Sequence, residues 1–149
     1  MGSNTDYAIM KEAEKILKTL NINFDTKIIS AHRTPLRMYE FAKTAHKKYK
    51  VIIAGAGGAA HLPGMISSLT SLPVIGVPVE TKSLKGLDSL LSVVQMPKGV
   101  VTATVAINNA MNAGLLAAQI VALLNGEIKK NLEKFRIKQT KSIKIKPKK

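Results

Sequence analysis

Two stretches of the 149-residue sequence place a histidine among small or polar residues, a pattern that suits proton-transfer chemistry. One is Ser30-Ala31-His32-Arg33-Thr34-Pro35, and the other is Gly55-Ala56-Gly57-Gly58-Ala59-Ala60-His61. Histidine titrates near neutral pH, so His32 can give and take a proton. The guanidinium of Arg33 suits a phosphate or a carboxylate. The alternative for His32 is a cap on the helix that Thr34-Pro35 starts.

The Gly/Ala stretch allows two interpretations. Its small side chains let the backbone approach a ligand closely, and N–H groups at a following helix start favour a phosphate. A plain tight-packing turn explains the same composition. His61, at the entry of an apolar helix, is either a structural histidine or part of a site. His46 lies among lysines and is expected at the surface.

The presence or absence of other motifs excludes several classes of reaction. Asp6 can cap a helix from Tyr7 onward, bind ligand hydroxyls, or do both. The sequence has no phosphate-binding GxxxxGK[ST] loop, no GxGxxG fingerprint with its acidic partner and no Ser–His–Asp order. It has no cysteine and no close His/Asp/Glu ligand spacing, so we expect no metal site. The interpretation left after these exclusions is proton transfer on a small phosphorylated ligand.

The net charge of +14 raises nucleic acid as a partner, but the pattern of charge argues against it. More than half of this charge lies in residues 126–149, most basic residues are lysine, and aromatic content is 4%. We therefore expect a solvated lysine-rich surface and tail. The sequence has no apolar run of about 20 residues and no leader-like start, which predicts a cytoplasmic protein without a membrane segment.

Apolar spacing and turn signals define the elements that must position these residues. Strands and helices alternate, which predicts an α/β fold with a parallel sheet and helices on both faces. Ligands bind beyond the carboxyl ends of such strands, where both histidine stretches and the start of the Val77-Pro78-Val79 loop fall. We expect helices over 7–20, 34–49, 63–69, 86–95, 110–124 and 127–138, and strands over 24–29, 50–54, 74–79 and 100–107.

Long motifs of the sequence closely resemble the N5-carboxyaminoimidazole ribonucleotide mutase family, the catalytic subunit of phosphoribosylaminoimidazole carboxylase in bacterial purine synthesis. The resemblance covers about residues 1–140 in one register. The motifs are Gly2-Ser3 with Asp6, Ser30–Pro35, Ile52–Gly64, Pro73–Val79, Gly86–Ser92 and Val94–Pro97.

This resemblance implies an isomerase with no cofactor and no metal. A carboxylate moves from the exocyclic nitrogen of the imidazole ribonucleotide to ring carbon 4, by a lyase-like decarboxylation and recapture of carbon dioxide. The essential histidine of the family corresponds to His32, as general acid and base. The implied substrate-binding residues are Gly2, Ser3, Asp6, Ser30, Ala31 and Arg33 for phosphate and ribose, and Gly57, Ala59, His61 and Leu62 for carbon dioxide.

The resemblance also implies a three-layer, flavodoxin-like fold and a homo-octamer whose sites are completed by neighbouring subunits. We expect one mutase domain over 1–138 and a basic tail over 139–149. The family's sheet includes an apolar strand ending in Met-Gly-Ser, and this chain starts at that methionine, so we expect the first strand to be absent here. The alternatives are a carboxylase that uses free carbon dioxide, a non-catalytic nucleotide-binding module, and nucleic-acid binding through the tail.

Overall fold

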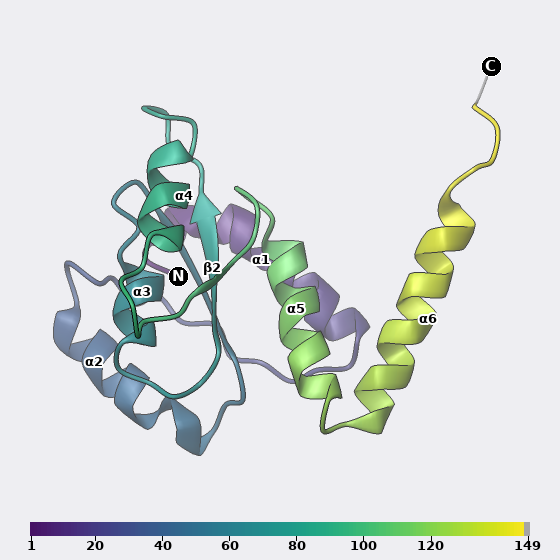
Figure 1. Cartoon of the computed structure of the whole chain (residues 1–149), viewed down its shortest axis with the longest axis horizontal. Helices are drawn as coiled ribbons and strands as arrows, with labels where there is room; N and C mark the ends of the chain where they lie inside the picture. The colour runs from purple at the N-terminus through teal and green to yellow at the C-terminus, as the bar shows by residue number, and fades with distance from the viewer. Residues whose placement is uncertain (148–149) are drawn as a thin grey trace.

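Three parallel strands lie at the centre of the computed structural model, which describes residues 1–147 (Figure 1). They are β1 (Ile52–Gly57), β2 (Val74–Val79) and β3 (Ala103–Thr104), in the order β1-β2-β3. Ile52 pairs with Val74 and Gly57 with Val79, so β1 and β2 end at the same edge of the sheet. The predicted α/β fold with a parallel sheet is confirmed.

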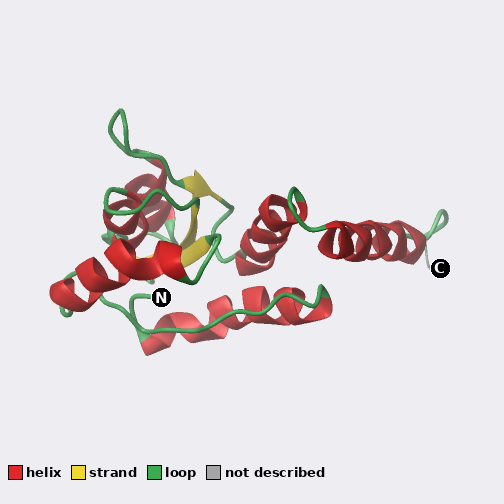
Figure 2. Cartoon of the chain, turned by 90° about the horizontal axis from the view of Figure 1, so that it is seen from below, coloured by secondary structure: helices red, strands yellow, loops and turns green. Residues whose placement is uncertain are grey.

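Helices cover both faces of the sheet (Figures 1 and 2). Alternate residues of β1 and β2 point to opposite faces. The helices are α1 (Tyr7–Thr19), α2 (Pro35–Thr44), α3 (Leu62–Ser67), α4 (Leu87–Val94), α5 (Ala110–Ala122) and α6 (Gly126–Ser142), with short 3-10 turns η1 (Asn4–Asp6) and η2 (Ala45–Lys47). Ile52, Ala54 and Val74 pack with α2, α3 and α4, whereas Ile75 and Val77 pack with α1 and α5.

The predicted strand over 24–29 is wrong, because these residues make no ladder with β1. Their backbone hydrogen bonds go to the start of the chain instead. The Met1 amino group donates to the Lys27 carbonyl oxygen at 3.0 Å, and the Ile29 N–H donates to the Met1 carbonyl oxygen at 2.8 Å. Beyond Met1, a groove separates residues 24–27 from β1.

The ends of two other elements also differ from the predicted ones. The predicted strand over 100–107 shrinks to the two residues of β3, which pair with Ile75 and Gly76 only. The helix predicted over 34–49 ends as α2 at Thr44 and continues as the turn η2. On α2, Leu36 is 78% exposed, whereas Met38 is buried in the core.

The last helix leaves the body of the molecule. Ile128 and Leu132 of α6 pack on Ile16 and Leu20, and the Asn131 side-chain amide donates to the Leu20 carbonyl oxygen. The helix then projects outward as far as Ser142, beyond the predicted end at 138 (Figures 1 and 2). The predicted tail over 139–149 is therefore helical in its first residues, and its last two lie outside the described residues. No helix of residues 1–147 is long and apolar enough to cross a membrane.

The contact between α1 and α5 depends on Gly114. A Cβ atom there would lie 2.3 Å from Cγ2 of Ile16 and 3.1 Å from the Ala13 carbonyl oxygen. Because part of this obstacle is backbone, we expect Gly114→Ala to lower the free energy of unfolding by about 1–3 kcal/mol, as overpacking does. Chemical denaturation of the variant checks this.

Gly126→Ala is the matched control, because a Cβ at this first residue of α6 meets nothing within 4 Å. Its stability should stay within about 0.5 kcal/mol of the parent, as surface substitutions do. Equal stability of the two variants would contradict the close packing of α1 on α5.

Candidate functional site

A cavity of about 360 Å³ opens at the carboxyl edge of the sheet. It brings together residues from the start of the chain, the turn after 24–29, the end of β1 and the end of β2. Each residue that the sequence nominated contributes to its wall. These residues are Gly2, Ser3, Asp6, Ser30, Ala31, His32, Arg33, Gly57, Ala59, His61 and Leu62.

Two histidines face each other in this cavity. Nε2 of His32 lies 2.8 Å from Nδ1 of His61, and the two rings are nearly perpendicular. In such a bond one nitrogen carries the proton and the other accepts it, so the pair can hold one proton between the rings. The alternative that His32 caps the following helix is wrong, because its side chain bonds to His61 instead.

The turn that carries His32 is fixed by its neighbours. The Ser30 N–H donates to the Thr34 hydroxyl at 2.9 Å, and that hydroxyl donates back to the Ser30 carbonyl oxygen at 2.9 Å. Thr34 occupies the N-cap position of α2 as predicted, but its side chain makes no capping bond. The Arg33 N–H and Nε both lie within reach of the Ser30 hydroxyl. Neither of the two ion pairs among the described residues uses Arg33, so its charge is available to the cavity.

His61 stands at the beginning of α3 and is exposed, so it is not a buried structural histidine. The Gly/Ala stretch before it divides into strand and turn. Gly55–Gly57 belong to β1, and Gly58 takes a φ of +67°, which favours glycine. A Cβ on Gly57 would lie 3.2 Å from both Thr81 Cγ2 and the Val79 carbonyl oxygen, so this wall tolerates little bulk.

A serine that the sequence did not nominate holds this loop in place. Ser89 is fully buried in α4; its hydroxyl donates to the Val79 carbonyl oxygen at 2.6 Å and accepts from the Gly58 N–H at 2.8 Å. It thereby joins the carboxyl ends of β1 and β2. Leaving such buried groups unpaired costs about 1–3 kcal/mol. Its helical position gave no signal for this role.

Thr5, Glu80 and Thr81 also line the cavity without having been nominated. Glu80 and Thr81 directly follow β2, so the rule that ligands bind beyond strand ends could have found them. Asn108 fixes Glu80, since its side-chain amide donates to the Glu80 carboxylate at 3.0 Å and its oxygen accepts from the Glu80 N–H. Among residues 1–147, no three His, Asp or Glu side chains gather in a way that could hold a metal ion.

Asp6 does not cap α1, as one interpretation had predicted. Its carboxylate instead accepts from the Ser3 N–H at 2.9 Å and closes a capping box on η1. Burial raises the pKa of Asp6 above its ordinary value of 3.8, and the hydrogen bond from Ser3 offsets part of this rise.

A raised pKa means that the folded protein holds the Asp6 proton more tightly than the unfolded chain. The resulting stability is fully present below pH 3.8 and is lost as the pH rises through the higher folded pKa. We therefore expect Asp6→Asn to gain stability relative to the parent as the pH rises from about 3.8, with the gain levelling off above the folded pKa.

Denaturation midpoints of both proteins between pH 3 and 7 check this prediction. A relative gain that shrinks with rising pH would mean that hydrogen bonding outweighs burial and that the pKa is lowered.

The fold and the cavity define a class: a doubly wound α/β protein with a histidine pair and an arginine at the carboxyl edge of a parallel sheet. The sequence profile of the AIR carboxylase family matches residues 1–142, and the chain belongs to this family. The predicted resemblance is thereby confirmed.

Comparisons with individual proteins agree with this family assignment. The chain is 55% identical over 144 residues to the N5-carboxyaminoimidazole ribonucleotide mutase of Thermotoga maritima, covering 96% of this chain and 84% of that protein. It is 51% identical to the chloroplastic phosphoribosylaminoimidazole carboxylase of Vigna aconitifolia, covering 96% of this chain but 26% of that protein. The crystal structure of Treponema denticola PurE superposes with a TM-score of 0.85 at 27% identity, covering 95% of this chain and 89% of that one.

Proposed function

We propose that this protein converts N5-carboxyaminoimidazole ribonucleotide into 4-carboxy-5-aminoimidazole ribonucleotide, an intramolecular carboxyl transfer in purine biosynthesis. The observation that carries the proposal is the histidine pair, which lies in one cavity with Arg33 and the small residues that end β1. The mutase named for the Thermotoga maritima relative, at 55% identity, supports the choice of substrate. We also propose a cytoplasmic location for this protein.

The reaction requires a proton to move opposite to the carboxylate. Breaking the bond between the exocyclic nitrogen and the carboxylate releases carbon dioxide, and the nitrogen takes up a proton. Ring carbon 4 then attacks the carbon dioxide and loses its own proton, so no net proton is exchanged. We assign both transfers to His32, because a histidine can act as acid and then as base near neutral pH.

The remaining residues of the cavity bind substrate in this proposal. Arg33 offsets the phosphate charge, with Gly2, Ser3, Ser30 and Ala31 around the phosphate and ribose, and Asp6 toward the ribose hydroxyls. Gly57, Ala59, His61 and Leu62 enclose the carbon dioxide released between the two steps. His61 also holds the ring of His32 through their 2.8 Å contact.

His32→Asn tests the proton-transfer role. Asparagine is polar and of similar size but cannot exchange a proton near neutral pH. We expect turnover to fall by about 10²–10⁴-fold, the usual contribution of a general acid–base group, while the ribonucleotide still binds. A spectrophotometric assay for turnover and calorimetry for binding check these two outcomes.

His46→Asn is the matched control, because His46 lies on η2, is exposed and does not line the cavity. It should keep the parent rate. A parent-like rate in the His32 variant would remove His32 from the chemistry, and loss of ribonucleotide binding in that variant would point to a binding role instead.

A carboxylase that takes free carbon dioxide is the second candidate. The name of the Vigna aconitifolia relative favours it, and so does the solvent exposure of His32 and His61 in the single chain. The mutase must retain carbon dioxide, and this requires a closed cavity.

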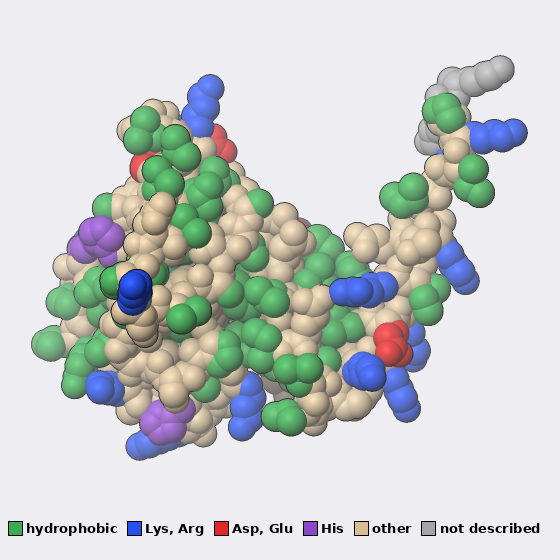
Figure 3. All heavy atoms as spheres, in the orientation of Figure 1, with side chains coloured by type: hydrophobic (Ala, Val, Ile, Leu, Met, Phe, Trp, Pro, Cys, Tyr) green, Lys and Arg blue, Asp and Glu red, His purple; other side chains and the backbone are tan. Residues whose placement is uncertain are grey.

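Exposed apolar side chains support closure by other copies of the chain. Leu87, Leu91 and Val94 form one face of α4, and about half of each is exposed. Leu123 and Leu124, between α5 and α6, are more than 80% exposed. Hydrophobic side chains also gather over the α4 side of the molecule in Figure 3. We propose a homo-oligomer, an octamer, in which these faces are covered.

Light scattering after size-exclusion chromatography should give about eight times the 16.1 kDa chain mass. Leu91→Glu should lower that mass, because a charge would be buried in the subunit contact. Thr19→Glu, on the exposed side of α1, should leave it unchanged. A monomeric parent protein would contradict the oligomer.

A further inference from the structure

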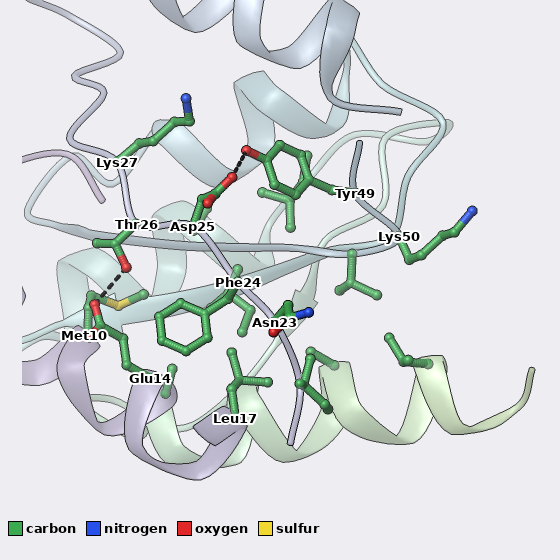
Figure 4. Close-up of a pocket in the computed structure, with 18 of the residues that line it drawn as sticks. Met10, Glu14, Leu17, Asn23, Phe24, Asp25, Thr26, Lys27, Tyr49 and Lys50 are labelled. Atoms are coloured by element: carbon green, nitrogen blue, oxygen red, sulfur yellow. Dashed lines mark hydrogen bonds between the residues drawn. The ribbon is translucent and has the colours of Figure 1, made fainter. Parts of the chain in front are cut away.

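The wall that encloses carbon dioxide in the proposed reaction is built from residues with almost no side chain. Here β1 passes into the turn 58–61, and Gly57 and Ala59 line the cavity. Glycine and alanine have no polar side-chain group that could anchor a turn. The groove beside β1 gives no support at this point, because β1 contributes residues 52–54 to it, further back along the strand (Figure 4). The position of the wall therefore depends on hydrogen bonds to its backbone.

The second half of the turn 58–61 is held without help from other side chains. The Ala60 N–H donates to the Gly58 carbonyl oxygen at 2.7 Å, and the His61 N–H donates to the Ala59 carbonyl oxygen at 2.8 Å, which makes two successive three-residue turns. Ala60 is fully buried in the core, and the His61 carbonyl oxygen accepts from the Met65 N–H of α3 at 2.9 Å. This half is therefore fixed by its own turns, by the core and by α3.

The first half of the turn is tied to α4 through Ser89. The Gly58 N–H donates to the Ser89 hydroxyl at 2.8 Å. That hydroxyl has a single proton, which it donates to the Val79 carbonyl oxygen at 2.6 Å, so its orientation is fixed. The Ser92 hydroxyl lies 3.4 Å from the Gly58 carbonyl oxygen, but its shorter bond, 2.7 Å, goes to the Asp88 carbonyl oxygen of its own helix. Ser89 therefore makes the short hydrogen bond from another element to this half of the turn.

Gly58 needs this bond because its own backbone is free to rotate. Its φ of +67° is one of several conformations that glycine adopts at little cost. Without the Ser89 hydroxyl, the Gly58 N–H and the Val79 carbonyl oxygen both lose a buried partner. The Gly58 N–H can regain a partner by turning toward water in the cavity. Such a rotation would open the wall at the place where carbon dioxide is enclosed.

We propose that Ser89 is a positioning residue that keeps released carbon dioxide in the cavity, by holding Gly58 and with it the wall formed by Gly57 and Ala59. This inference rests on the proposed function. Ser89 does not line the cavity, so its removal leaves the groups that act on the substrate in place. Decarboxylation then continues, but carbon dioxide escapes before ring carbon 4 attacks it. In that case N5-carboxyaminoimidazole ribonucleotide and one proton give aminoimidazole ribonucleotide and carbon dioxide; His32 supplies the proton to the nitrogen and regains one from water.

Ser89→Ala tests this role through the ratio of two products. Chromatography measures the initial rates at which aminoimidazole ribonucleotide and 4-carboxy-5-aminoimidazole ribonucleotide form from N5-carboxyaminoimidazole ribonucleotide, after the rate without enzyme is subtracted. We expect the ratio of the first product to the second to rise at least tenfold over the parent, while substrate consumption stays near the parent rate. A merely structural role would lower both products together and leave their ratio unchanged, and this result would overturn the proposal.

Gly114→Ala is the matched control, because it is expected to destabilise the fold to a similar extent but does not line the cavity. It should keep the parent ratio. Circular dichroism verifies folding, and if Ser89→Ala does not fold, Ser89→Cys decides, because a thiol fills the buried position but hydrogen-bonds weakly. The parent ratio in the deciding variant would overturn the role of Ser89 and leave the proposed function intact. A parent protein that forms no 4-carboxy-5-aminoimidazole ribonucleotide would instead overturn the proposed function, and this inference with it.

Discussion

The parallel pairing of β1 with β2 is the constraint on which the site depends. The register from Ile52–Val74 to Gly57–Val79 makes both strands end at one edge of the sheet. A parallel sheet requires helical crossovers, and these cover its two faces and leave the carboxyl edge open. The turn after segment 24–29 reaches the same edge, which allows His32 and His61 to meet at 2.8 Å. Ser89 fixes this edge from behind by joining Gly58 to Val79.

The sequence predicted the features that depend on local spacing. The apolar run of β2 and the helical periodicity of α1 predicted the ends of these two elements to within one residue. The nominated site residues all line one cavity, because each belongs to a motif beside a strand end or helix start. Glu80 and Thr81 follow the same rule and could have been found with it.

The features that the sequence could not predict depend on partners far along the chain. Segment 24–29 has the composition of a strand, but a strand also needs a neighbouring backbone to pair with. Among residues 1–147 only Met1 supplies part of one. Thr34 and Asp6 have the residue types of helix caps, yet Ser30 and Ser3 engage their side chains. The bond between His32 and His61 crosses 29 positions, so no local pattern encodes it.

The groove and the cavity share one backbone connection. Met1 lines the groove, and the next two residues, Gly2 and Ser3, line the cavity. The backbone that places the phosphate-binding end of the proposed site therefore also borders the groove beside β1.

Transfer of the carboxylate within one closed cavity is the central claim, and the fate of a carbon label tests it directly. N5-carboxyaminoimidazole ribonucleotide labelled with carbon-13 in its carboxylate would be converted in excess unlabelled bicarbonate, and the product analysed by mass spectrometry. A mutase with His32 beside an enclosed carbon dioxide predicts that the label is retained in 4-carboxy-5-aminoimidazole ribonucleotide. Loss of the label to the bicarbonate pool would contradict this account and identify a carboxylase.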